Sequence, residues 1–351
     1  MGLKMENKQA MWNWPEVMLR RIPANYLLVS YLLFILVFLI YYSFSLRVFW
    51  FQWHIYHILQ SLATSLLIAY LLAGLVYLSE KTRRTFKYID WLYGSHKEDY
   101  FAKIESRVTG GLYYHLLFYL SLLVPFIVMS WGQWPYYERQ EDIWARGLDI
   151  YGYFLYFLIL ALLAEVLWLM ANIVWSVNEM GCSSSAFSAA VGVYGIDMKL
   201  RPVRNFFLIF IVYYFIAIAL VIGTYISPSG QISIEPIYFG VLLAMGVVLF
   251  VAGLEAVQRI INCRVENELD ILNKKRNEQH QALVNIVSSG SAEKAKDIEN
   301  ASKILDIIHK ERESLLQVSR RAYDIATLSL FISSFLIPLL TLLEKLGLIH
   351  K

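Results

Sequence analysis

Charged residues are almost absent from seven long stretches of the sequence. None of the 31 Lys and Arg residues falls within them, and only two carboxylates, Glu165 and Glu255, do. Each stretch has about the ~20 apolar residues that a helix needs to cross the ~30 Å hydrocarbon core of a bilayer. This absence of charge predicts seven membrane-spanning helices. They cover residues 25–46, 55–78, 110–131, 150–175, 206–226, 237–258 and 325–343.

The sequence is also poor in charge as a whole, because 17% of its residues are charged and 58% are hydrophobic. That composition is too apolar for a soluble domain of 351 residues to hide in one core. The net charge is only +3, and sorting of the basic residues by side of the membrane accounts for it. Composition therefore predicts an all-α integral membrane protein, and we expect no nucleic-acid partner.

Few residues of the kinds that carry chemistry are present. Cys182 and Cys263 lie in segments that are predicted to face the cytoplasm, where thiols stay reduced, so we expect no structural disulfide. The seven His residues are scattered. The sequence has no His-Glu-x-x-His metal motif, no Gly-x-Ser-x-Gly nucleophile elbow and no phosphate-binding glycine loop with Lys. We therefore expect neither an enzyme nor a cofactor or metal site.

The basic residues alternate between the two sides of the predicted spans. Of the 31 Lys and Arg residues, 26 fall before the first stretch or after the second, fourth and sixth. Short loops that are rich in Lys and Arg stay on the cytoplasmic side of a membrane. We therefore expect a multi-pass protein of the cell membrane, with a cytoplasmic amino terminus and an outside carboxyl terminus.

One long segment outside the apolar stretches, residues 259–322, changes abruptly to Glu, Lys, Asn and Gln with interleaved aliphatics. Ser288, Gly290 and Ser291 mark a turn near its middle. Aliphatic and small residues recur every three or four positions along the returning arm, as in a coiled-coil seam. The sequence thus predicts a cytoplasmic antiparallel coiled-coil hairpin between spans six and seven. The predicted regions are a cytoplasmic amino-terminal segment (1–24), a six-helix transmembrane region (25–258), the hairpin (259–322), and the seventh span with a short outer tail (323–351).

The hairpin is predicted to continue directly into the membrane. No Pro separates the sixth span from the outgoing arm, or the returning arm from the seventh span. Two nearly continuous helices would then project into the cytoplasm and transmit movement of the hairpin to spans six and seven. The charged outer face favours pairing with other subunits or with a cytoplasmic protein, whereas a self-contained hairpin would already bury both of its seams.

Glu165 lies near the middle of the fourth predicted span. An ionised carboxylate at that depth costs about 2.5–3.5 kcal/mol, so the side chain should face the bundle interior, pair, or keep its proton. Spacing by seven places Tyr151, Glu165, Asn172 and Glu179 on one stripe of the helix. Such a stripe could line a water-filled path, or it could hold helices together by hydrogen bonds. Glu255 is interpreted as structural, because it lies near the predicted cytoplasmic boundary and Arg259 follows one turn later.

A second polar stripe lies in the seventh predicted span. Thr327, Ser334 and Thr341 are seven residues apart, with Pro338 between the last two. The missing amide of Pro338 frees the carbonyl of Ser334 and predicts a kink. Hydroxyl groups beside an unpaired carbonyl could line a cation or water path. The alternative is that small residues here allow close helix contact.

The amino-terminal segment has two interpretations. Trp12 and Trp14 precede Arg20 and Arg21, and Pro23 then turns the chain toward the first span. Such a segment could lie along the membrane surface. It could equally be a loosely ordered tail.

Two functions follow from these patterns. The layout of seven spans, an inside amino terminus and a long inner segment entering the last span is similar to that of insect chemoreceptor channels, in layout alone. The first function is a permeation protein, an oligomeric ion channel or channel-like transporter, with Glu165, Asn172, Ser334 and Thr341 near the path. The second is a membrane scaffold or sensor that recruits a cytoplasmic partner through residues 259–322.

Overall fold

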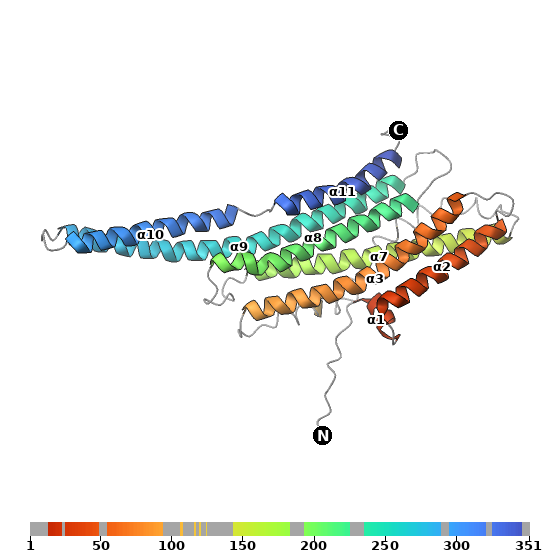
Figure 1. Ribbon diagram of the computed structural model, residues 1–351, viewed down its shortest axis with the longest axis horizontal. Coiled ribbons are helices and arrows are strands. Elements are labelled where there is room, and N and C mark those ends of the chain that lie inside the picture. The colour runs from red at the N-terminus through yellow and green to blue at the C-terminus, as the bar shows by residue number, and fades with distance from the viewer. Residues whose placement is uncertain are drawn as a thin grey trace, which may run out of the picture.

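The computed structural model consists of long helices (Figure 1). Within the residues that it describes, every regular element is a helix and no strand occurs. The structure describes residues 13–22, 25–48, 55–93, 143–182, 193–224, 235–288, 295–320 and 325–345, with the short pieces 106–107, 116, 119–120 and 124. The helices are α1 (Trp14–Arg20), α2 (Tyr26–Val48), α3 (Ile55–Tyr93), α7 (Ile143–Cys182), α8 (Val193–Thr224), α9 (Glu235–Ser288), α10 (Ala295–Arg320) and α11 (Ile325–Lys345).

Five of these helices are long and apolar enough to cross a membrane, so the chain is an all-α membrane protein. Each of the five overlaps all or nearly all of one predicted span. The third predicted span, 110–131, lies outside the described residues except at four positions. The seventh corresponds to α11, whose apolar part, Ser329–Glu344, is shorter than the other five. The five candidate spans are Tyr26–Arg47, Ser61–Lys87, Ile143–Glu179, Leu200–Ile222 and Phe239–Asn285.

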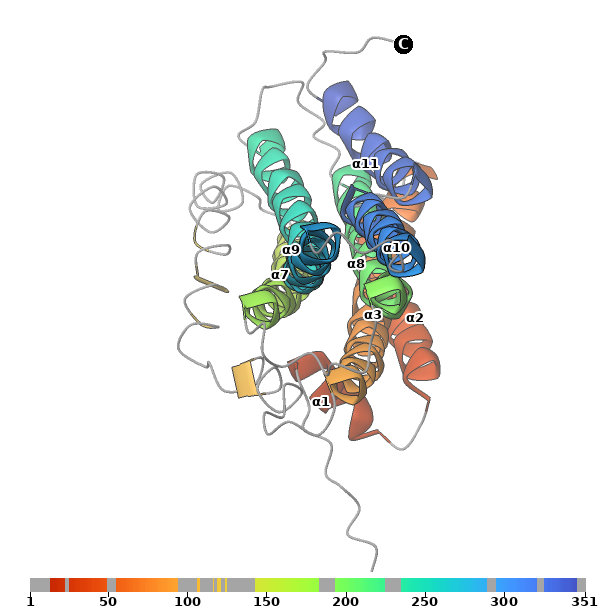
Figure 2. The same cartoon turned by 90° about the vertical axis from the view of Figure 1, so that its left-hand side faces the viewer.

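Helix α8 lies at the centre of the bundle, where it packs against α3, α9 and α11 (Figures 1 and 2). Helix α2 lies at the edge and packs on α3 and α7. Only 11% of the most apolar window of α2 is buried, against 61% for α3 and for α8. The outward side of α2 is therefore the surface that lipid would cover, whereas α3, α7 and α8 contribute many of the core residues.

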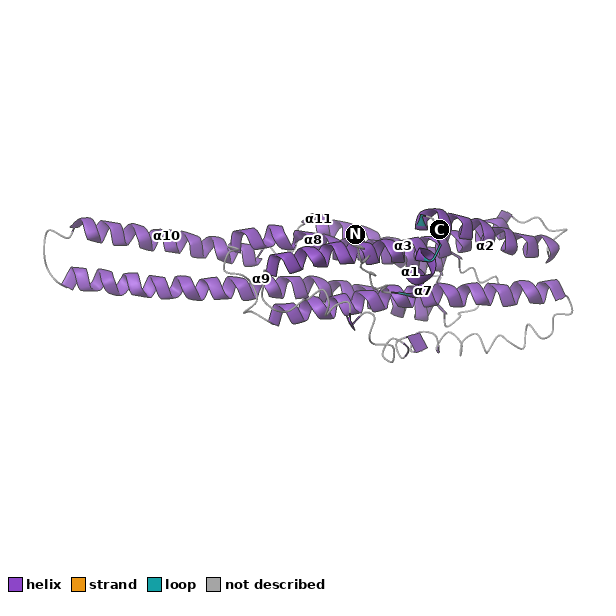
Figure 3. Ribbon diagram, turned by 90° about the horizontal axis from the view of Figure 1, so that it is seen from below, coloured by secondary structure: helices purple, strands orange, loops and turns teal. Residues whose placement is uncertain are grey.

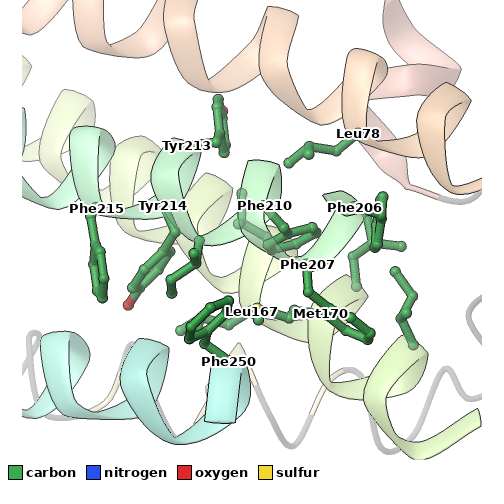
Figure 4. Close-up of a cluster of buried hydrophobic side chains, with 14 of the residues drawn as sticks. Leu78, Leu167, Met170, Phe206, Phe207, Phe210, Tyr213, Tyr214, Phe215 and Phe250 are labelled. Atoms are coloured by element: carbon green, nitrogen blue, oxygen red, sulfur yellow. The ribbon is translucent and has the colours of Figure 1, made fainter. Parts of the chain in front are cut away.

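The core around α8 is built from aromatic rings (Figure 4). Phe206, Phe210 and Phe215 are fully buried, and the rings of Phe206 and Phe210 meet edge to face at 5.8 Å. Neighbouring helices approach closely because glycines face several of these rings, and a Cβ atom on any of those glycines would overlap the ring. The overlapping pairs are Gly74 of α3 with Tyr213, and Gly246 and Gly253 of α9 with Tyr214 and Phe207.

Hydrogen bonds from two tyrosines add direction to this packing. The hydroxyl of Tyr213 donates to the carbonyl oxygens of Tyr70 and Leu71 on α3, each at 3.1 Å. The hydroxyl of Tyr214 donates to the carbonyl oxygen of Leu242 on α9 at 2.8 Å. Buried phenols need such partners because an unpaired hydroxyl in an apolar interior is costly. Helix α8 is thus tied to both neighbours by rings and by hydroxyl groups.

Helices α9 and α10 extend well beyond the bundle and run side by side in opposite directions (Figures 1 and 3). We call residues 262–288 of α9 together with α10 the stalk. Helix α9 is continuous over 54 residues, so the segments predicted as the sixth span and the outgoing arm belong to one helix, as expected. The junction of α10 with α11, residues 321–324, lies outside the described residues. The buried side chains of the stalk recur every seven positions: Val265 and Leu272 on α9, and Ala301, Ile308 and Leu315 on α10.

Candidate functional site

Glu165 is buried near the middle of α7, with only 1% of its surface exposed. Its neighbours along the helix, from Leu162 to Leu167, are apolar and buried as well. A carboxyl group in such surroundings is expensive unless polar groups contact it. The sequence predicted a side chain that faces the bundle interior, and the burial of Glu165 agrees with that orientation.

The polar contact of Glu165 comes from two segments far away in the sequence. The hydroxyl of Tyr119, in the third predicted span, forms a side-chain hydrogen bond to Glu165. The indole Nε1 of Trp14 in turn donates to the hydroxyl oxygen of Tyr119 at 3.2 Å. A chain of two hydrogen bonds therefore joins α1, residue 119 and α7.

Helix α1, which begins this chain, is short but has a well-formed start. The side chain of Asn13 caps it by accepting a hydrogen bond from the backbone N–H of Glu16 at 2.8 Å, and Pro15 lies in the first turn. A helix of seven residues is not stable alone in water. Contacts with the bundle must therefore hold α1 in place.

The strongest of these contacts is an ion pair between Glu16 and Arg83 of α3. It is bidentate, with Nη1–Oε1 and Nη2–Oε2 distances of 2.6 and 2.7 Å. Glu16 is 0% exposed and Arg83 is 6% exposed. Paired hydrogen bonds of this kind are the strong ones among charged groups. Breaking a buried pair by removing one partner typically costs about 3–5 kcal/mol, because the remaining charge stays uncompensated.

A third contact lies one helical turn away from the ion pair. The amide of Asn13 donates to the hydroxyl of Ser79 on α3 at 2.7 Å, and both residues are buried. Ser79 and Arg83 belong to the second half of α3 (Ile55–Tyr93), and this end of the helix points toward the stalk (Figure 1). We call these joined side chains the α1 network. Its members are Asn13, Trp14, Glu16, Ser79, Arg83, Tyr119 and Glu165.

The described part of the amino-terminal segment, residues 13–22, is not a loose tail, because it contains α1 and its Asn13 and Glu16 are buried against α3. Its placement along the membrane surface stays a prediction. The sequence carries a signal for the helix itself, since Asn13 followed three residues later by Glu16 is a capping pattern. It carries no signal for burial, because the partner Arg83 is 67 positions away.

The other members of the predicted stripe on α7 have separate partners. The side chain of Asn172 donates to the carbonyl oxygen of Trp168 on its own helix at 2.9 Å. Glu179 forms an ion pair with Arg107. The ring of Tyr151 lies 5.9 Å from that of Phe44 on α2. Of this stripe, Glu165 is the member that belongs to the α1 network.

Ser334 and Thr341 lie on α11, which continues through Pro338. The hydroxyl of Ser334 donates to the carbonyl oxygen of Phe331, and that of Thr341 donates to the carbonyl oxygen of Ile337, each at 2.9 Å. Both hydroxyls therefore bond to their own helix. The predicted kink at Pro338 stays a prediction.

The four predicted path residues are not in one cluster. Helix α7 carries Glu165 and Asn172, whereas α11 carries Ser334 and Thr341, and the two helices lie on opposite sides of α8 (Figures 1 and 2). Helix α11 packs on α8 and α9, where the ring of Phe331 stacks on that of Phe250 at 4.6 Å. Heptad spacing identifies residues on one face of one helix, but it does not tell which helices are neighbours.

Two further sequence expectations concern Glu255 and metals. Glu255 pairs with Arg259 one turn later at 3.4 Å, as predicted. Arg259 also donates to the side chain of Asn178 at 2.9 Å and so links α9 to α7. Within the described ranges, no three His, Cys, Asp or Glu side chains form a group that could hold a metal ion.

Comparison of the chain with known proteins finds no matching family model, no matching curated protein and no matching solved structure.

Proposed function

We propose that this protein is a permeation protein, an ion channel or channel-like transporter whose path passes Glu165. The observation that carries the proposal is the burial of this carboxyl group in the middle of an apolar span, with hydrogen bonds leading from it to α1. Ionisable groups at such a depth are costly, and they commonly mark ion pathways and proton relays. A carboxylate attracts cations, so the transported species is a cation or a proton.

The path runs on the side of α8 where α1, α3 and α7 meet. The α1 network supplies hydrogen-bonding groups along this side, from Ser79 and Arg83 on α3 and from Tyr119 beside Glu165. The opposite choice, a path along α8, has no support, because aromatic side chains fill that region and glycines there contact rings directly.

Ser334 and Thr341 would line a second stretch of the path, separate from the one at Glu165. Helix α11 lies at the edge of the bundle (Figure 2), so a path past these hydroxyls needs a neighbouring subunit to close it. With this second stretch, the protein acts as a homo-oligomer. The apolar, exposed side chains of Leu336 and Leu340 on α11 would then face lipid or that neighbour.

In this proposed arrangement the protein has seven spans, with residues 110–131 as the third and α11 as the seventh. The stalk is an antiparallel coiled coil in the cytoplasm, and the carboxyl terminus lies outside. The distribution of basic residues supports this orientation, since 26 of 31 lie on the side assigned to the cytoplasm. The unbroken helix α9 supports coupling, because a rigid helix carries movement of the stalk into the membrane.

Ion flux into liposomes that contain the purified protein tests the proposal. We expect flux of protons, Na⁺ or K⁺ under an applied gradient, and we expect Glu165→Gln to change its rate by at least about tenfold, or about 1.4 kcal/mol in the barrier. Glu255→Gln is the matched control, because it removes the other carboxylate of the apolar stretches and should leave the rate within about twofold. Ser334→Ala with Thr341→Val tests the second stretch. Absence of flux, or equal rates for Glu165→Gln and the native protein, would refute the proposal.

A second candidate function is that of a membrane scaffold or sensor. The observation that favours it is a set of exposed aliphatic side chains on the stalk, where water and not lipid is the expected surrounding. Exposed apolar groups of this kind mark protein contacts. These side chains are Ile271, Val284, Val287, Ile298, Ile304 and Ile307.

Deletion of residues 262–318, followed by sizing of the detergent-solubilised protein, separates the roles of the stalk. If the stalk joins subunits, we expect the deletion to reduce the assembly to a smaller particle. If the stalk recruits another protein, we expect unchanged assembly size and loss of that partner. Unchanged size with no loss of a bound partner would remove both roles.

A further inference from the structure

Helix α1 packs on α3 and is linked to Glu165 through Tyr119. Its Trp14 is hydrogen-bonded to Tyr119, which contacts Glu165, and its Glu16 neutralises Arg83. With α1 in this position Glu165 is 1% exposed and Ser79 is 0% exposed. The docked state is therefore one in which water does not reach these polar groups.

The way in which α1 is attached makes it able to detach alone. It consists of seven residues and contacts α3 and α2, and its buried side chains include Pro15, Glu16 and Leu19. One ion pair and two side-chain hydrogen bonds link residues 13–16 to α3 and to Tyr119. Segments with few buried apolar contacts open locally without unfolding of the whole protein.

We propose that α1 is a latch. When it is docked, the route to Glu165 is closed and the carboxyl is positioned through Trp14 and Tyr119; when it is undocked, water and ions reach Glu165. The Glu16–Arg83 pair holds the latch shut, and Trp14 and Tyr119 are positioning residues for Glu165. The effect on flux rests on the proposed permeation function, whereas docking and covering are measurable without flux.

Hydrogen–deuterium exchange of the full-length protein in nanodiscs measures docking. Arg83→Met removes the guanidinium that holds buried Glu16 in a bidentate pair, and we expect exchange in residues 14–20 to become at least about a hundredfold faster. Glu16→Met together with Arg83→Met removes both charges, and we expect protection to return to within about tenfold of the native value. Trp14→Phe removes one donor, and we expect about two- to tenfold faster exchange. Unchanged exchange in residues 206–215 checks that the core is intact.

Cysteine labelling measures covering in a chain with Cys182→Ser and Cys263→Ser. Ser79→Cys places a thiol beneath α1. Ser65→Cys is the matched control, because it lies on the same helix, is equally buried at 0% exposure, and bonds only to its own helix. With a water-soluble maleimide we expect neither thiol to react in the native background. With Arg83→Met we expect Ser79→Cys to react at least about tenfold faster and Ser65→Cys to stay unreactive.

Flux is the last readout. We expect Arg83→Met and Trp14→Phe to raise the rate in liposomes, in the order of their effect on exchange. Equal exchange in Arg83→Met and the native protein, or equal labelling of Ser79→Cys in both backgrounds, would overturn the latch regardless of flux. Faster exchange and labelling with an unchanged, measurable flux would overturn the gating role and leave the permeation function standing. Docking and covering as expected, with no flux from any variant, would refute permeation and with it the gating role.

Discussion

The core around α8 and the α1 network are both buried, but different forces hold them. The α8 core joins three helices through many aromatic and aliphatic contacts, and two tyrosine hydroxyls add hydrogen bonds to backbone carbonyls. The α1 network joins a seven-residue helix to the bundle through one ion pair and a few side-chain hydrogen bonds. The α8 core thus depends on many non-directional contacts, whereas α1 is attached by a few directional ones.

This difference predicts different responses to loss of a single side chain. Dispersion contacts are individually weak and collectively strong, so a missing ring in the α8 core weakens the whole bundle. In the α1 network one group carries a large share of the attachment, so its loss frees α1 and leaves the bundle folded. Substitutions in each region, each paired with a control, test this difference.

Removal of a core ring should have the largest effect on global stability. Phe210 is 0% exposed and contacts Phe206, so Phe210→Ala leaves a cavity among packed rings. We expect the free energy of unfolding to fall by about 3–5 kcal/mol, measured by unfolding in mixed detergent micelles. Phe154→Ala on α7 is the control, because its ring is exposed and should be worth less than about 1 kcal/mol. Equal losses for both variants would contradict a core centred on α8.

An added methyl group in the core should have the next largest effect. A Cβ at Gly246 would overlap the ring of Tyr214, so Gly246→Ala must push the ring or separate α8 from α9. We expect a loss of about 1–3 kcal/mol in the same measurement. Gly152→Ala on α7 should instead stabilise by about 0.5–1 kcal/mol, since its Cβ meets open space and Ala favours a helix. A gain of stability for Gly246→Ala, like the gain expected for Gly152→Ala, would show that the close approach of α8 and α9 does not require a glycine at position 246.

The parts of the fold that follow from local properties could be predicted from the sequence. A helix that spans a membrane needs length and apolarity, and both are properties of one continuous segment. Five of the predicted spans accordingly coincide with helices of the structure. The continuity of α9 past residue 258 was equally predictable, because it depends on the absence of Pro. The pairing of Glu255 with Arg259 depends only on spacing along one helix.

The contacts that form the candidate site could not be predicted in the same way. Glu16 and Arg83 are 67 positions apart, and Trp14 and Tyr119 are 105 positions apart. Neither pair has a periodicity that connects its members. The separation of Glu165 from Ser334 has the same origin, because hydropathy defines each helix but leaves its neighbours undetermined. Glu165 itself was predictable as a buried carboxyl, whereas its partners were not.

Two ion pairs of similar length provide the sharpest form of the contrast. Lys303 and Glu299 on α10 are 2.6 Å apart, as are Arg83 and Glu16. The side chains of Lys303 and Glu299 are 67% and 63% exposed, whereas Arg83 and Glu16 are buried. Water screens exposed pairs, so Lys303→Ala should change the stability of α10 by less than about 0.5 kcal/mol. Hydrogen exchange across residues 295–320 measures this change. Added salt should make it smaller still, since the screening length falls to about 3 Å at 1 M.

Glu16→Gln, in contrast, removes the carboxylate charge that pairs with the buried Arg83, and the same salt should leave the release of α1 almost unchanged. The two variants thus differ in burial while sharing ion-pair chemistry. If salt altered both to the same extent, the Glu16–Arg83 pair would be reached by water in the docked state. Helix α1 would then not seal the approach to Glu165, and the distinction between the two buried regions would reduce to one of size.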